Sequence, residues 1–254
     1  MNSAKKFDVL RTILSVLIAL AISFVIIFLV SEQPFEAIKN LLIGPLTSKR
    51  NMGNVVESMI PLIFTGTGVC IMFSANQINL GGEGAFHMGG LVASIIAIWV
   101  TGKFVSPVLA LICAGLVGAL FTAIPAIMKI TTSASEMVSS LMINYVALYF
   151  GNYMLNNVIG DPAASAASYK LSEASELPVL VDGTRVHLGI IIALAVAVLG
   201  YVFLYRTKMG YQLRITGENE EFARYSGINI VKVILVSQLL GGFVIGLGGG
   251  VEML

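Results

Sequence analysis

Charged side chains are scarce in this chain. Asp, Glu, Lys and Arg make up 11% of its 254 residues, whereas hydrophobic residues make up 57%, and the mean hydropathy is +0.90. A typical soluble domain carries about 25% charged residues. This composition excludes an ordinary soluble domain and indicates a protein that lies in a lipid bilayer.

Cysteine and histidine are equally scarce, with two of each. Cys70 and Cys113 both fall inside apolar runs, where we expect them to pack rather than to form a disulfide. Two histidines on separate segments make a poor metal site. The sequence also lacks the Gly-x-x-x-x-Gly-Lys-Ser/Thr, His-Glu-x-x-His and Gly-x-Ser-x-Gly motifs. We therefore expect no catalytic residue, metal or cofactor, and no dense basic run indicates nucleic-acid binding.

Seven apolar runs approach or exceed the length that crosses the hydrocarbon core, which takes about 20 residues per helix. Each run is apolar on every face, whereas the strands of a membrane barrel alternate. The first run is followed by SEQPFEAIKN instead of a small-residue cleavage site, so it reads as an uncleaved helix. The sequence predicts an all-α, polytopic helical membrane protein with one transmembrane domain over residues 1–254. The runs are Thr12–Val30, Val55–Phe73, Ala85–Thr101, Phe104–Met128, Glu136–Leu155, His187–Tyr205 and Val231 onward.

Basic residues in the loops predict the orientation, because they stay on the cytoplasmic side during insertion. The larger number lies inside if the N-terminus is cytoplasmic, which places 206–230 in the cytoplasm and makes 156–186 an extracellular loop. The predicted inner residues are Lys5, Lys6, Arg11, Lys129, Arg206, Lys208, Arg214, Arg224 and Lys232, and the outer ones are Lys39, Lys49, Arg50, Lys103, Lys170 and Arg185.

Two of the runs carry small residues at four-residue intervals. Small residues let helix backbones approach closely in lipid, so we expect these runs to pack tightly, and a glycine-weakened, mobile helix beside a pathway is compatible with the same pattern. The stripes are Ala110, Ala114, Gly118, Thr122 and Ala126 in one run, and Gly242, Gly246 and Gly250 in another.

The segment SANQINLGGEG (74–84), between the second and third runs, clusters amides, a carboxylate and glycines. Polar backbone at membrane depth persists only where it is buried in protein or lines water. One interpretation is a broken helix or re-entrant turn whose Asn76, Gln77, Asn79 and Glu83 face a substrate pathway. The other is an ordinary cytoplasmic turn, with Glu83 at the positive end of the next helix. The sequence leaves both open.

The fifth run contains further polar residues. Asn144 and Tyr145 lie about two turns from its start, where an unpaired amide is costly, so we expect each to bond a neighbouring helix or to line the pathway. Ser133-x-x-Glu136 matches a capping box, and we expect Glu136 to satisfy amides at the helix start.

The most charged part of the chain is residues 206–230, RTKMGYQLRITGENEEFARYSGINI, which holds seven charged residues between two apolar runs. Glu221-x-Ala223-x-x-x-Gly227 places an acidic residue, a small residue and a glycine at helical spacing, followed by a helix stop. A solvated loop explains the composition but not this spacing. The pattern therefore indicates a docking surface for a cytoplasmic partner.

Three stretches carry a family resemblance: ANQINLGGEGAFHMGG, SASEMVSSLMINY and TKMGYQLRITGENEEFARYSGIN. In this order they resemble permease subunits of bacterial binding-protein-dependent ABC importers, in the nucleoside branch related to the ribose and branched-chain amino-acid permeases. The resemblance implies a multi-pass plasma-membrane protein that translocates nucleosides by alternating access. It also implies a second permease subunit, an ATP-binding subunit that binds the ATP, and an extracellular substrate-binding lipoprotein. A ribose-type sugar permease and, further off, a passive channel or scaffold are the alternatives.

The resemblance assigns coupling to the ATPase to the segment 217–227. Members of the group continue with further spans beyond Leu254, so we expect this sequence to be truncated at its C-terminus. The residues that match the coupling pattern, or that we expect to act beside it, are Glu218, Glu221, Ala223, Arg224 and Gly227.

Overall fold

A computed structural model describes residues 3–100, 102, 105–161, 168–172 and 175–254. The predicted run ends at Thr101 and Phe104, and parts of the predicted 156–186 loop, lie outside the described residues. The chain divides into two compact units, residues 1–55 and 56–254. The first holds α1 (Ser3–Val30), α2 (Pro34–Leu42) and the short 3-10 helix η1 (Gly44–Leu46). The first predicted run lies within α1.

The second unit is a helical bundle. Its helices are α3 (Lys49–Phe73, from residue 56 onward), α4 (Gly82–Trp99), α5 (Val105–Thr132), α6 (Glu136–Asn157), α7 (Gly189–Arg206), α8 (Lys208–Glu218), α9 (Glu220–Tyr225) and α10 (Ile230–Met253). In the described part of the chain, extended pairing is limited to two isolated bridges, Gly160 with Ser168 and Val179 with His187.

Six helices are long and apolar enough to cross a membrane: α1 from Leu10, α3, α4, α5, α7 and α10. The all-α polytopic fold is therefore confirmed. Helix α6 forms over the fifth predicted run, but its serines and asparagines keep it outside this group. The count of seven spans, the cytoplasmic N-terminus and the single domain stay predictions.

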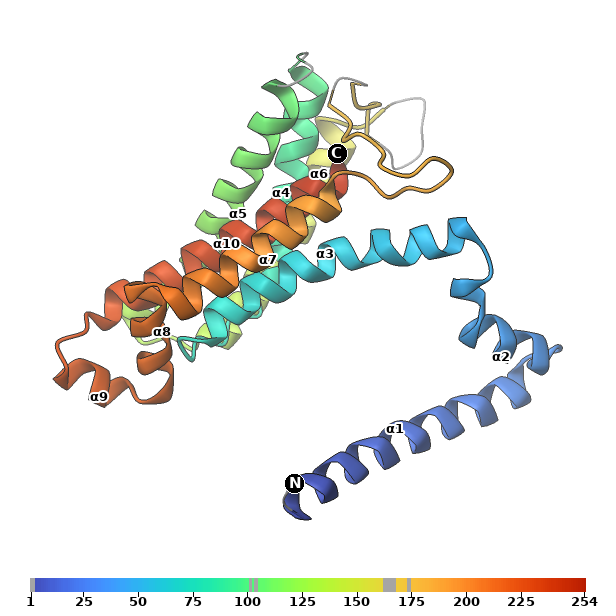
Figure 1. The fold of residues 1–254 in the computed structure, drawn as a ribbon. Coiled ribbons are helices and arrows are strands. Elements are labelled where there is room, and N and C mark those ends of the chain that lie inside the picture. Colours follow the sequence, from blue (N-terminus) through green and yellow to red (C-terminus); the bar gives the residue numbers. More distant parts are fainter. Residues whose placement is uncertain (1–2, 101, 103–104, 162–167, 173–174) are drawn as a thin grey trace. The chain divides into compact units, whose positions relative to one another are not determined.

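Helix α10 lies within the bundle and packs against α5, α4 and α7 (Figure 1). The two small-residue stripes meet along α5 and α10. A Cβ atom added at Gly118 would lie 2.6 Å from the Cα atom of Gly246, and one added at Gly250 would lie 2.8 Å from the Cβ atom of Ala114. Both approaches are too close for a larger residue, so the predicted tight packing is confirmed.

The connecting segments of the second unit lie at two opposite ends of the bundle. The described part of the 156–186 loop folds onto the end where α10 finishes, where the Leu177 amide donates to the Leu254 carbonyl oxygen (2.8 Å). Helices α8 and α9 lie at the opposite end of this unit (Figure 1). The polar segment after α3 lies there as well, because the backbone of α8 at Gly217 touches Ser74. The polar segment 74–84 and the charged segment 206–230 thus share one end of the bundle.

Candidate functional site: a buried polar ring and an exposed docking surface

Residue Asn76 turns the chain out of α3. Its φ angle is +54°, in the left-handed region that asparagine tolerates better than most residues. The Gln77 amide donates to the Met72 carbonyl oxygen (3.3 Å), and the Asn76 amide donates to that of Phe73 (2.9 Å). These two bonds are the pattern of a glycine-type helix stop, with asparagine in the glycine position. The Asn76 side chain itself is exposed.

The segment that follows, residues 74–81, alternates between buried and exposed side chains. Ala75, Gln77 and Asn79 are buried, whereas Ile78 and Leu80 are 43% and 39% exposed. From Gln77 to Leu80 the polar side chains thus point inward and the apolar ones outward, the reverse of a surface turn in water. Buried side-chain amides need protein partners, and those of Gln77 and Asn79 both have them.

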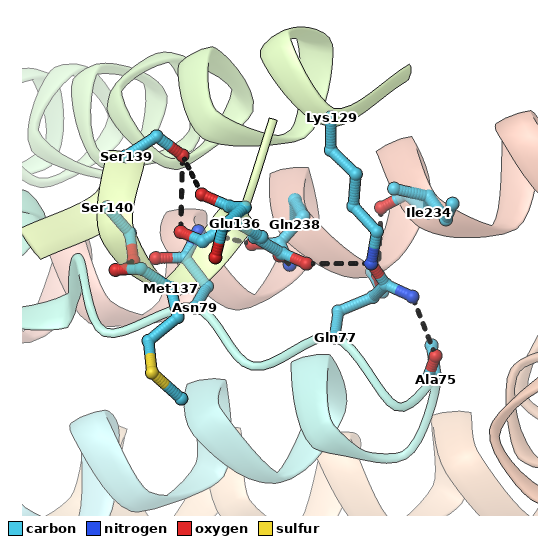
Figure 2. Close-up of polar contacts among 12 residues, drawn as sticks. Ala75, Gln77, Asn79, Lys129, Glu136, Met137, Ser139, Ser140, Ile234 and Gln238 are labelled. Carbon is cyan, nitrogen blue, oxygen red and sulfur yellow. Dashed lines mark hydrogen bonds and ion pairs between the residues drawn. The ribbon is translucent and has the colours of Figure 1, made fainter. Parts of the chain in front are cut away.

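Five side chains form a continuous chain of polar contacts between two residues of segment 74–81, and we call them the polar ring (Figure 2). The Lys129 ammonium donates to Gln77 Oε1 (2.5 Å) and to Glu136 Oε2 (3.0 Å). Gln238 Nε2 donates to Glu136 Oε1 (2.5 Å), and Asn79 Nδ2 donates to Gln238 Oε1 (2.7 Å). The ring starts and ends in segment 74–81 and passes through α5, α6 and α10.

The polar ring contains one ion pair, and its donors and acceptors determine how the side-chain amide of Gln238 is oriented. Glu136 is 5% exposed and Lys129 is 34% exposed, so a buried carboxylate pairs with a partly buried ammonium. Because the carboxylate only accepts, Gln238 must present its NH₂ group to Glu136 and its oxygen to Asn79. Asn79 Oδ1 accepts from the Gly81 amide (2.7 Å). A network satisfied in this way specifies one arrangement of the elements that it joins.

The predicted capping role of Glu136 is wrong. Helix α6 begins at Glu136 itself, with Ser135 as the N-cap residue and no side-chain cap, while Ser133 takes a left-handed φ of +56°. Ser133 lies two residues too early to cap, so the Glu136 carboxylate is free to turn inward to Lys129 and Gln238. The sequence interpretation missed both partners. A glutamine eight residues into an apolar helix is the signal that could have found Gln238.

Helix α6 also holds the start of α4. The Ser140 hydroxyl accepts from the Leu80 amide (2.9 Å). One turn further along, Asn144 accepts from the Gly84 amide (2.9 Å) and donates to the Leu80 carbonyl oxygen (2.8 Å). The bond to Gly84 satisfies an amide that the first turn of a helix leaves unpaired, and the bonds to Leu80 hold the chain just before α4. The interhelical bond expected of Asn144 is confirmed, while Tyr145 is 57% exposed.

The segment reaches into the bundle. Gln238, which Asn79 contacts, lies eight residues into α10, which corresponds to about 12 Å along the helix axis. This depth favours a broken helix over a turn at the helix ends. Glu83, in the first turn of α4, is exposed and borders a pocket of about 410 Å³ with Phe73, Phe86 and His87. Among the residues that the structure describes, no three His, Cys, Asp or Glu side chains gather as a metal site.

Helix α9 is defined at both ends by its own sequence. Asn219 is the N-cap residue, and its side chain accepts from the Phe222 amide (2.9 Å). At the other end Gly227 has a φ angle of +79°, and the Ile228 amide donates to the Ala223 carbonyl oxygen (3.0 Å). This is the Schellman arrangement. The helix stop predicted at Gly227 is confirmed.

One face of α9 packs on the bundle, and the other faces outward. Ala223 is fully buried against Ala126, Ile230 and Ile234, at the ends of α5 and α10. A small residue is needed there to seat α9. Glu221 and Arg224 of α9 are exposed, as is Glu218, the last residue of α8.

Two aromatic residues that the sequence interpretation missed share the outward face of α9. Phe222 is 58% exposed and Tyr225 is 90% exposed. Aromatic residues and arginine are enriched in protein interfaces, so two aromatics among alternating charges were the available signal. We call Glu218, Glu221, Phe222, Arg224 and Tyr225 the docking surface.

Comparisons with known proteins all match this chain to transport permeases. The sequence profile described as branched-chain amino acid transport system / permease component matches residues 51–254. The chain is 33% identical over 209 residues to the guanosine ABC transporter permease protein NupP of Bacillus subtilis, covering 79% of this chain and 59% of that protein. It is 30% identical over 253 residues to the glucose ABC transporter permease protein TsgB13 of Haloferax volcanii, covering 95% and 67%.

A third relative is the nucleoside ABC transporter permease protein NupB of Lactococcus lactis, 25% identical over 258 residues, covering 94% of this chain and 70% of that protein. The chain therefore spans 59% to 70% of the length of these three relatives. No solved structure matches the chain at a significant level.

Proposed function

The chain belongs to the family of permease components of branched-chain amino acid transport systems, and we propose that it is a permease subunit of an ATP-driven importer that carries nucleosides across the bacterial plasma membrane. Two of the three relatives are named for guanosine or nucleoside transport. The observation that carries the transport role is the docking surface: exposed charges and aromatics on a short helix that is capped at both ends and seated on the bundle.

In this proposal the chain supplies part of the pathway and other subunits supply the rest. A cytoplasmic subunit binds and hydrolyses ATP and contacts the docking surface. A second permease subunit completes the pathway, and an extracellular lipoprotein delivers the solute. Alternating access follows if the helices rearrange around the pathway as the ATP-binding subunits close and open.

Six residues were predicted to line the substrate pathway. The amides of Gln77, Asn79 and Asn144 are bonded to protein groups, and we propose that they shape the pathway wall. Glu83 borders an open pocket, and we propose that its carboxylate accepts hydrogen bonds from the solute's hydroxyl groups. Asn76 and Tyr145 are exposed, and their place in the pathway stays a prediction.

The docking role is tested by charge reversal. Glu221→Lys or Arg224→Glu should lower co-purification of the ATP-binding subunit by about tenfold or more, the equivalent of one lost charge-assisted contact, while membrane insertion is unchanged. Arg185→Glu is the matched control, because Arg185 is exposed and lies in the loop before α7, away from the docking surface. Unchanged assembly in both Glu221 and Arg224 variants would remove this role.

The substrate class is tested by uptake in cells that express the complete importer. Labelled guanosine should accumulate in an ATP-dependent manner, and unlabelled ribose or glucose should not compete. The second candidate is a simple-sugar importer, which the 30% identity to a glucose permease favours. Accumulation of sugar alone would select that candidate.

A passive channel or scaffold is separated from an importer by the need for ATP. We expect solute flux into proteoliposomes to stop when the partner ATPase is inactivated. Flux that continues without hydrolysis would contradict the importer.

A further inference from the structure

Helix α8 touches segment 74–81 through Gly217, in its last turn. A Cβ atom added at Gly217 would overlap the Ser74 carbonyl oxygen and would lie 3.1 Å from the Ser74 carbonyl carbon and 3.3 Å from the Asn76 amide nitrogen. The two backbones are therefore in direct contact at the point where α3 ends. Any larger residue would force them apart.

Apolar packing joins the same two elements beside this contact. Leu213 of α8 and Ala75 of the segment are both fully buried in one core cluster with Leu204 and Val233. Helix α8 leads into α9 through Asn219 alone. A force on the docking surface therefore reaches the start of segment 74–81 through a rigid helix and a packed contact.

Thr216, the neighbour of Gly217, has an unusual environment. It is 2% exposed, and its hydroxyl is a buried side-chain polar group that has no hydrogen-bond partner within the described part of the chain. Leaving such a group unpaired is unfavourable. The orphaned hydroxyl has a simple explanation if this contact rearranges and the hydroxyl finds a partner in a second conformation.

The C-terminal part of segment 74–81 is joined to the helices that we propose to form the pathway. Gln77 and Asn79 join it to α5, α6 and α10 through the polar ring, and the Leu80 amide bonds to Ser140. The segment continues directly into α4, whose first turn carries Glu83. One end of segment 74–81 thus contacts the helix that precedes the docking surface, and the other end sets the position of α4.

We propose that segment 74–81 transmits movement of the docking surface to the pathway, and that Gly217 is the positioning residue at the contact. This inference rests on the proposed importer function. When the ATP-binding subunit moves α9, α8 shifts the Ser74 backbone, the polar ring distributes the shift to α5, α6 and α10, and α4 moves with Glu83.

The test is Gly217→Ala in the complete importer, reconstituted in proteoliposomes with its ATP-binding subunit, second permease subunit and substrate-binding protein. Capture of the ATP-binding subunit and ATP hydrolysis should stay within about twofold of wild type, because the docking surface is unaltered. The amount of solute imported per ATP hydrolysed should fall by roughly tenfold, since the added methyl group displaces the contact. A merely structural role would lower assembly and both activities together.

Gly151→Ala is the matched control. Gly151 also lies in a helix, α6, but a Cβ atom added there would meet nothing within 4 Å. We expect its import per ATP to equal that of wild type.

Thr216→Val is the second variant, and it keeps the test decisive if Gly217→Ala does not assemble. Valine has the shape of threonine without the hydroxyl, so it should raise the thermal denaturation midpoint of this conformation. It should also lower import per ATP by about threefold, because the second conformation loses its hydrogen bond.

The outcomes separate the two levels of proposal. If wild type captures the ATP-binding subunit and imports solute, but both variants import normally, the transmission role of segment 74–81 is overturned and the importer function stands. If wild type itself shows neither capture nor ATP-dependent import, the importer function fails and the inference fails with it.

Discussion

Two ion pairs at the same end of the bundle show how differently one kind of contact can be used. Lys129 and Glu136 lie 3.0 Å apart in the polar ring, where Glu136 is 5% exposed. Glu220 and Arg224 lie 3.1 Å apart on α9, where they are 51% and 70% exposed. The two distances are nearly equal, so the two ion pairs differ in their exposure to water and not in their geometry. The first pair is held by further protein partners, Gln77 for Lys129 and Gln238 for Glu136, whereas each member of the second is exposed enough to exchange its partner for a group on another protein.

This contrast extends to the neighbouring residues. In the polar ring and in α6, the amides of Gln77, Asn79 and Asn144 have protein partners, and their removal leaves buried groups unpaired. On the docking surface, Phe222 and Tyr225 expose apolar area that only an outside partner can cover. The residue type alone therefore says little about role in a membrane protein. Burial separates residues that hold the bundle together from residues that stay available for other contacts.

The largest expected effect comes from Glu136→Ala. The change removes the acceptor of Gln238 Nε2 and one of the two acceptors of the Lys129 ammonium, which keeps Gln77. It should lower the free energy of unfolding by about 2–3 kcal/mol, less than for a fully buried pair because Lys129 is partly exposed. Titration with SDS in detergent micelles measures this. Glu220→Ala, the matched exposed variant, should change the same quantity by about 0.5 kcal/mol or less.

If Glu136→Ala and Glu220→Ala lowered the free energy of unfolding equally, the contrast between the buried and the exposed ion pair would be contradicted. They would mean that water reaches the polar ring and screens its charges as it does on α9.

An intermediate effect is expected from Asn144→Ala. The Gly84 amide and the Leu80 carbonyl oxygen lose their partner, so the free energy of unfolding should fall by about 1–2 kcal/mol. Tyr145→Phe at the next position should stay within about 0.5 kcal/mol, because its ring is mostly exposed. The same SDS titration compares the two, and a larger loss for Tyr145→Phe would contradict the assigned burial of α6.

The smallest effect on stability is expected from Asn219→Ala, on the docking side. Loss of the N-cap should cost about 0.5–1 kcal/mol, and because α9 has only six residues, this should loosen the helix locally. Hydrogen exchange at the α9 amides should speed up, and capture of the ATP-binding subunit should weaken by a few fold.

The control for Asn219→Ala is Asn229→Ala, which removes the N-cap of α10, where Asn229 accepts from the Lys232 amide (3.0 Å). Packing holds that 24-residue helix, so capture should be unchanged. Weaker capture in both variants would show that caps act on the whole bundle and not on α9.

Local patterns in the sequence were enough to predict several features. The glycine stripe of α10 and the small-residue stripe of α5 predicted that each helix packs tightly, because four-residue spacing places small residues on one helix face; that the two stripes pack against each other was not predicted. Asn219 and Gly227 bound α9 by bonds within a few residues of themselves, so the helix stop was predictable. Asn144 was expected to find an interhelical partner, because an unpaired amide in an apolar run is costly.

Long-range partners could not be predicted in the same way. Glu136 matched a capping pattern four residues long, yet its carboxylate meets Gln238, which lies 102 positions away. Asn79 reaches the same residue across 159 positions. Residue spacing within a short stretch cannot predict such contacts, because they depend on how α5, α6 and α10 pack.

The sequence by itself thus determined that this is an all-α membrane protein with a charged segment and a helix stop between two apolar runs, since composition, run length and a glycine stop are local properties of the chain. Only the tertiary structure decided which polar residues are used internally and which face outward. It buried Gln77, Asn79, Glu136 and Gln238 in one ring and left the docking surface exposed, because burial depends on the helices that close over a side chain and not on the side chain itself.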